Sequence, residues 1–189
     1  MIGALPTTLD VGGKEWAIRS DFRNVLTIFE ALEDDELEDR DKMYILLARI
    51  YVDFEKMPKE FYQEACEKAN SFIECHSRED DRKNPKLINW EKDEQMIFPA
   101  INAVAGCEVR AVEYLHWWTF LGYFESVDNE SLWSFVLSIR QKRAQGKKLE
   151  KYERDFYNKN KAMCSVERVK AKKAEDDLMD MFEILSEGG

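Results

Sequence analysis

An aromatic stretch of eleven residues limits the folds open to this chain more than any other feature. Residues 114–124 hold six aromatic rings and one of the chain's two histidines. An amphipathic helix usually restricts its apolar residues to one stripe. Five side chains of the stretch share such a stripe, namely Tyr114, Trp117, Trp118, Leu121 and Phe124. Phe120 and Tyr123 fall outside it, so either the helix crosses the middle of the fold or part of its aromatic surface contacts a partner.

We predict that this helix covers about residues 109–126 and that most of its rings are buried, because several amphipathic helices need a central element to pack on. Phe120 and Tyr123 are the candidate partner contacts. Gly122 lies in the same helix, and its missing side chain predicts the close approach of another helix.

The composition favours a mainly α protein, a multi-helix domain with a sizeable core. Hydrophobic residues make up 44% of the 189 residues, and only four prolines and eight glycines interrupt the chain. Apolar residues alternate on both sides of Gly12 and Gly13, which predicts a β-hairpin at about residues 7–18. Helical stripes follow near residues 22–32, 43–54, 61–73, 90–105, 109–126, 129–146 and 149–157.

Three of these helices carry further expectations. Pro99 should kink or split the helix near residues 90–105. The helix near residues 129–146 should turn Leu132, Phe135, Val136 and Ile139 inward and end at Gly146.

The chain is expected to divide into a helical domain of residues 1–160 and a C-terminal helical extension of residues 161–189. A polar stretch at about residues 77–88 predicts a mobile surface loop within the domain. In the extension, apolar residues return after a polar gap at residues 170–177, so we expect a partly detached C-terminal helix.

No pattern in the sequence points to catalysis, so we do not expect an enzyme. The two histidines, His76 and His116, have no nucleophile and orienting acid at a recognisable spacing. The four cysteines are widely separated and no ligand cluster is evident, so neither a metal nor a cofactor is expected. No apolar run reaches the roughly 18 residues of a membrane span, and the N-terminus does not resemble a signal peptide. We therefore expect a cytosolic protein that makes no contact with a membrane.

The charges are unevenly distributed. Residues 140–173 hold 13 Lys and Arg against 4 acidic residues, a net charge of +9, so the remainder carries −19 of the total of −10. Such a segment can track phosphates, but the acidic remainder would repel a nucleic acid and no recognition motif accompanies the segment. The basic segment either pairs with the acidic surface of its own chain or attracts an acidic protein partner. The candidate partner contacts in it are Arg140, Arg143, Lys147, Lys148 and Lys151.

The motif Leu115-His116-Trp117-Trp118-x-Phe120 gives the chain a resemblance to a known family. Leu132-Trp133-Ser134-Phe135, Ile139-Arg140 and Gly146-Lys147-Lys148-Leu149 follow it. Leu5-Pro6-Thr7-Thr8, Gly12-Gly13 and Phe22-Arg23 precede it. Together they resemble the "gene product fifteen" family of long-tailed bacteriophages and prophages of Gram-positive bacteria. Cys107-Glu108-Val109 departs from the Ile-Asp-Leu-like triplet expected before the motif.

The resemblance implies a small helical phage protein that acts in the cytoplasm of the host bacterium. Its implied role is that of a tail-assembly chaperone, which coats the tape-measure protein while tail-tube subunits polymerise around it. The resemblance leaves two further interactions undecided, namely contact with the tail-tube protein and assembly into a homo-oligomer. One alternative is a minor tail or tail-completion component of the virion. A second is a nucleic-acid-binding factor that uses residues 140–173.

Overall fold

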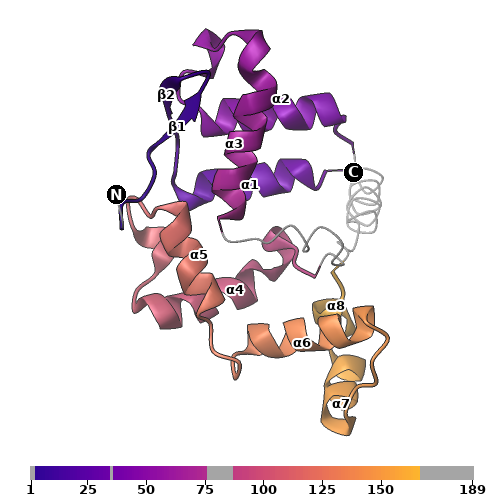
Figure 1. The fold of residues 1–189 in the computed structure, drawn as a ribbon. Helices are drawn as coiled ribbons and strands as arrows, with labels where there is room; N and C mark the ends of the chain where they lie inside the picture. The colour runs from indigo at the N-terminus through magenta and orange to yellow at the C-terminus, as the bar shows by residue number, and fades with distance from the viewer. Residues whose placement is uncertain (1–2, 35, 76–86, 167–189) are drawn as a thin grey trace, which may run out of the picture. The chain divides into compact units, whose positions relative to one another are not determined.

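The computed structural model describes residues 3–34, 36–75 and 87–166 (Figure 1). Nearly all of the predicted loop at residues 77–88, and the predicted C-terminal helix, lie outside the described residues. The chain separates into two compact units, residues 1–135 and residues 136–189. The predicted boundary at residue 160 falls inside the second unit.

The first unit begins with the predicted β-hairpin. Strands β1 (Thr8–Val11) and β2 (Lys14–Ala17) pair antiparallel, and Leu9 lies opposite Trp16. Gly12 has φ +61° and Gly13 has φ +74°, the left-handed conformation that a two-residue hairpin loop requires. A Cβ on Gly12 would lie 2.5 Å from the ring of Phe61, so the turn also packs closely on the helical part of the unit. The hairpin prediction is confirmed.

The rest of the first unit is helical, which confirms the mainly α prediction. Its helices are α1 (Phe22–Leu32), α2 (Asp39–Ile50), α3 (Tyr62–Glu74), α4 (Trp90–Ala105) and α5 (Trp117–Glu125). Short 3-10 turns cover Phe54–Lys56, Lys59–Phe61 and Val109–Ala111. Helix α1 packs against α2, α4 and α5, while α3 packs against α2 and β1 (Figure 1). The fully buried side chains Val25, Ile28, Leu47, Ile50 and Ile101 come from α1, α2 and α4. Helix α4 continues through Pro99 without splitting.

Tertiary pairing ends α2 earlier than its apolar stripe predicts. Tyr51 is extended and forms an isolated bridge with Ile18, next to the end of β2. The Arg19 guanidinium donates to the backbone carbonyls of Ala48 (2.9 Å) and Tyr51 (2.7 Å), among others. The prediction that this helix reaches residue 54 is therefore wrong, because the backbone N–H of Val52 donates to the carbonyl of Ala17 in β2 and not to the helix.

Helix α6 (Leu132–Ala144) spans the boundary, and α7 (Lys151–Lys159) and α8 (Lys161–Cys164) complete the described part of the second unit. Gly146 has φ +67° and follows the end of α6, as its position in the sequence predicts. The buried face of α6 includes Trp133, whereas Leu132 is 48% exposed. The prediction that Leu132 faces inward is wrong, because the large indole of Trp133 takes the buried position one residue later.

Candidate partner-binding surface

His116 is a structural residue that starts helix α5. It occupies the N-cap position, and its Nδ1 accepts a hydrogen bond from the backbone N–H of Trp118 at 3.0 Å. Since Nδ1 is the acceptor, the neutral ring carries its proton on Nε2, which lies 3.0 Å from the carbonyl oxygen of Pro6 and donates to it. Both ring nitrogens are thus engaged in a side chain that is only 3% exposed. His116 therefore joins the N-terminal segment to α5.

The two adjacent tryptophans bind the end of helix α3. The indole Nε1 of Trp117 donates to the carbonyl oxygen of Ile73 at 2.9 Å, and that of Trp118 donates to Phe72, also at 2.9 Å. These carbonyls belong to the last turn of α3, where the helix itself offers no partner. The indoles supply the missing donors, so the motif holds α5 against the end of α3.

Phe120 lies in the core of the first unit. It is 0% exposed, and its ring stacks on Phe22 with 4.3 Å between centroids and 6° between planes. A partner cannot reach it in this structure, so the prediction of a partner contact at Phe120 is wrong. The buried face of α5 is formed by Trp117 and Phe120, which are three residues apart, and it therefore differs from the stripe read from the sequence. Tyr123 is half-buried and keeps some accessible ring surface.

The interpretation of Gly122 is also wrong. A Cβ at this position would meet nothing within 4 Å, so no neighbouring helix approaches it.

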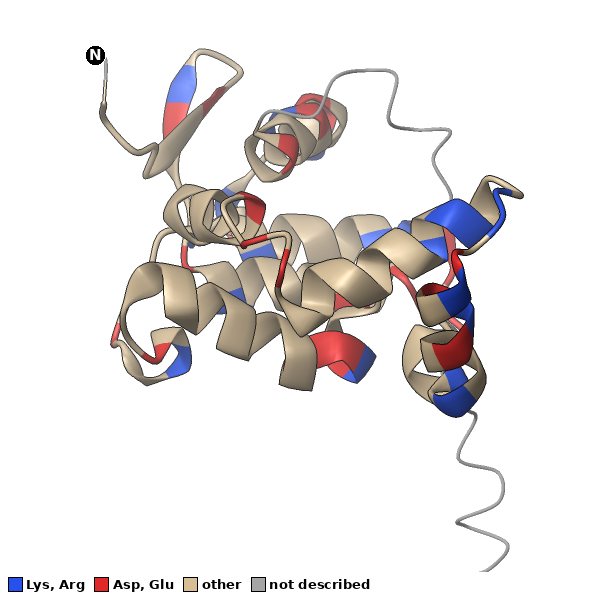
Figure 2. Cartoon of the chain, turned by 90° about the horizontal axis from the view of Figure 1, so that it is seen from below, with Lys and Arg blue, Asp and Glu red and all other residues tan. Residues whose placement is uncertain are grey.

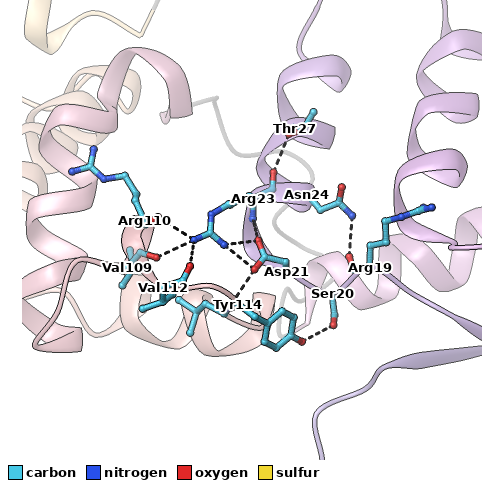
Figure 3. A network of polar contacts seen from close by, with 11 residues as sticks. Arg19, Ser20, Asp21, Arg23, Asn24, Thr27, Val109, Arg110, Val112 and Tyr114 are labelled. Carbon is cyan, nitrogen blue, oxygen red and sulfur yellow. Dashed lines mark hydrogen bonds and ion pairs between the residues drawn. The ribbon is translucent and has the colours of Figure 1, made fainter.

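A polar network explains why the aromatic helix begins at Trp117 and not near residue 109 (Figure 3). Asp21 caps α1 by accepting from the backbone N–H of Arg23, and its second carboxylate oxygen accepts from the N–H of Leu115 at 3.0 Å. The Arg23 guanidinium forms an ion pair with Asp21 at 2.9 Å and donates to the carbonyl of Val112 at 2.5 Å. Backbone bonds from Phe22 to Leu115 and from Trp117 to Ser20 extend the pairing. The segment before α5 is thus held extended against the start of α1.

Sequence reasoning missed the contacts of Asp21 and Arg23 with residues 109–115. The pair Phe22-Arg23 is one of the motifs that resemble the family. Its distance along the sequence from the aromatic motif does not reveal that the two segments are in contact.

The described residues of the second unit carry a net positive charge. Its described residues, 136–166, hold nine Lys and Arg against three acidic residues, a net charge of +6. In Figure 2, where the ribbon is blue at Lys and Arg, blue segments gather on the C-terminal part of α6, on the loop after it and on α7. An open hollow lies among them, which we call the basic hollow; it is lined by Arg143, Gly146, Lys147, Lys148, Leu149, Arg154, Tyr157 and Asn158. Four of these residues are cationic and none is acidic.

Of the five predicted contacts in the basic segment, three line the basic hollow and two do not. Arg143, Lys147 and Lys148 are exposed and belong to its lining. Arg140 is only 3% exposed and donates to the backbone carbonyls of Met163 and Ser165, so it holds the end of the described chain on α6 and cannot meet a partner. Lys151 is exposed at the start of α7 but is not part of the lining.

Two side-chain contacts join α6 to α7 at the hollow. The Arg143 guanidinium lies over the ring of Tyr157, 4.1 Å from its centroid. Lys142 pairs with the buried carboxylate of Glu153 at 2.5 Å, and Glu153 also accepts from the backbone N–H of Glu150 in a capping box. The hydrogen bond from Lys142 lowers the pKa of Glu153 below its usual value. This carboxylate is paired with Lys142 and is not part of the lining, which contains no acidic residue.

A family model described as "Bacteriophage Gp15 protein" matches residues 1–166 of the chain. The chain belongs to the bacteriophage Gp15 family. Membership of the Gp15 family indicates a phage structural or tail-related protein and confirms the resemblance seen in the sequence. No curated protein and no solved structure gives a significant match.

The Gp15 match includes both the α5 motif and the whole lining of the basic hollow. The two regions differ in their access to a partner. The side chains of the motif make contacts inside the first unit, whereas the hollow is open to solvent. None of the helices among the described residues is long and apolar enough to cross a membrane.

Proposed function

We propose that this Gp15-family protein is a non-enzymatic tail-assembly chaperone that binds the phage tape-measure protein, and that the basic hollow is its main contact. The proposal rests on family membership together with one observation. This observation is a concave surface whose lining contains four cations, the half-buried ring of Tyr157 and no acidic residue.

The motif at α5 supports the proposal indirectly. Its histidine, both indoles and Phe120 are engaged in hydrogen bonds or stacking inside the first unit. A motif used in this way stabilises a scaffold and leaves binding to other surfaces. The basic hollow is such a surface, since its lining holds four cations and joins two helices through Arg143 and Tyr157.

The chemistry of the hollow favours an amphipathic helix with acidic side chains. Lys147, Lys148 and Arg154 would pair with carboxylates, while Leu149 and Tyr157 offer apolar and aromatic surface to one face of the helix. A tape-measure protein is expected to be a long helical chain whose apolar stripes aggregate when exposed. Complementary charge would speed the encounter and orient the bound segment.

Co-expression with the tape-measure protein of the same phage tests the proposal. The wild-type chain should keep the tape-measure protein soluble and co-purify with it, and the double variant Lys147→Glu, Lys148→Glu should lose this capture. The matched control is Lys159→Glu, Lys161→Glu, because these exposed lysines lie in the same unit, outside the lining, and their substitution changes the net charge equally. Equal capture by the wild type and both double variants would exclude the basic hollow as the contact.

Two further measurements separate the proposal from other roles. A chaperone should be absent from purified virions, and its presence there in stoichiometric amounts would favour a structural tail component. Binding of the purified protein to single-stranded DNA at about 0.15 M salt, lost in Lys147→Glu, Lys148→Glu, would favour a nucleic-acid role for the same surface.

A further inference from the structure

The basic hollow and the last residues of the same chain are complementary in charge. Residues 174–189 contain six acidic residues and no Lys or Arg, a net charge of −6, which matches the +6 of residues 136–166. Apolar residues recur in this segment at helical spacing, namely Leu178, Met181, Phe182 and Leu185. The segment thus has the acidic and apolar composition that the hollow's lining would accommodate.

The other acceptor for this segment would be the first unit, and charge disfavours it. Residues 1–135 hold 15 Lys and Arg against 28 acidic residues, a net charge of −13. An acidic segment is repelled by such a surface and attracted by the hollow, where four cations have no acidic neighbour in the lining.

The segment also starts close to the hollow along the chain. The described residues end at Val166, just after α8, and α8 packs on α7, which contributes Arg154 and Tyr157 to the lining. The seven residues 167–173 that join Val166 to the acidic segment can extend over at most about 25 Å. Tethering at this length gives an effective concentration on the order of millimolar, so even a weak contact would be largely occupied.

We propose that the acidic segment of residues 174–187 docks in the basic hollow of its own chain. The docking does not depend on the proposed function; one consequence does, namely that an acidic tape-measure helix would have to displace the segment before binding. The docked C-terminal segment would then exclude other acidic proteins from the hollow.

Zero-length carbodiimide crosslinking of the full chain tests the docking, because it joins an amine to a carboxylate only where the two are in contact. We expect crosslinks from Lys147 and Lys148 to the carboxylates of residues 175–180, found by mass spectrometry in the monomer fraction. Lys159 and Lys161, equally exposed but outside the lining, serve as the internal control. Crosslinks spread evenly over all four lysines would overturn the proposal, and crosslinks confined to a dimer fraction would overturn docking within one chain.

A binding assay gives a second readout. The full chain with Glu175→Gln, Asp176→Asn and Asp177→Asn should bind a labelled peptide of residues 174–189 about tenfold more tightly than the wild type, because its hollow is no longer occupied. Adding Lys147→Glu and Lys148→Glu to this variant should abolish the gain. Equal peptide affinity of the wild type and the triple variant would contradict the proposal, whatever the result of the tape-measure capture.

Discussion

The sharpest prediction concerns the two adjacent tryptophans of α5. If Trp117 and Trp118 serve to satisfy the end of α3, replacing either indole by a phenyl ring should destabilise the first unit without affecting the partner-binding surface. The substitution keeps an aromatic ring and removes the N–H that donates to Ile73 or Phe72.

The two positions should differ in magnitude. Trp117 is 1% exposed, so Trp117→Phe removes roughly two buried ring carbons, which costs about 1.5 kcal/mol. It also leaves the carbonyl of Ile73 without its donor in a buried place, which costs about 1 to 3 kcal/mol. The expected loss in the free energy of unfolding is therefore about 2.5 to 4.5 kcal/mol. Trp118 is half-buried and water can replace its N–H, so Trp118→Phe should cost about 0.5 to 1.5 kcal/mol.

Urea unfolding followed by tryptophan fluorescence measures both losses. All five tryptophans lie within residues 1–135, so the fluorescence of the remaining four reports on the first unit alone. Tape-measure capture should persist in whatever fraction stays folded. A loss below about 0.5 kcal/mol at Trp117, the size typical of surface substitutions, would refute the structural role. The same result combined with lost capture would make the motif a binding surface.

Three other changes have outcomes that follow from single contacts. Gly122→Ala should raise the free energy of unfolding by about 0.5 to 1 kcal/mol, because the site is helical and a Cβ meets nothing there; urea unfolding would measure the gain. Gly12→Ala should lower the same quantity by more than about 1 kcal/mol, because φ is positive and the new Cβ would collide with Phe61; an unchanged midpoint would contradict the hairpin packing. Glu153→Gln should destabilise the second unit at pH 7, as seen by far-ultraviolet circular dichroism. Its pKa is lowered by Lys142, so the wild-type advantage is fully present above the unfolded pKa of about 4.3 and should decline as pH falls through the lower folded pKa; an advantage that does not decline at all as the solution is acidified would argue against the ion pair.

Much of the fold follows from local signals in the sequence. The stripes that mark α1 and α3 and the glycine pair of the hairpin identify their elements because a helix or a two-residue turn depends on neighbouring residues. Gly146 marks the end of α6 for the same reason. The basic character of the second unit is likewise visible from residue counts alone.

The boundaries and the choice of buried face needed the tertiary structure. Helix α2 stops at Ile50 because Tyr51 pairs with Ile18, and α5 starts at Trp117 because the segment before it bonds to Asp21 and Arg23. These partners are some 30 to 95 residues apart in the chain, beyond the reach of any periodicity.

The aromatic stretch shows most clearly what the sequence determines and what the tertiary structure determines. By itself the sequence determined that residues 114–124 carry more rings than one stripe can bury, and that they mark a phage protein family. The tertiary structure decided how the rings are used. The end of α3 needed hydrogen-bond donors and Phe22 offered a stacking surface, so Trp117, Trp118 and Phe120 became internal contacts. The sequence likewise does not show which cations of the basic segment are accessible. Only the fold distinguishes the buried Arg140 from the accessible Lys147 and Lys148, because the burial of Arg140 depends on carbonyls that are distant in the sequence.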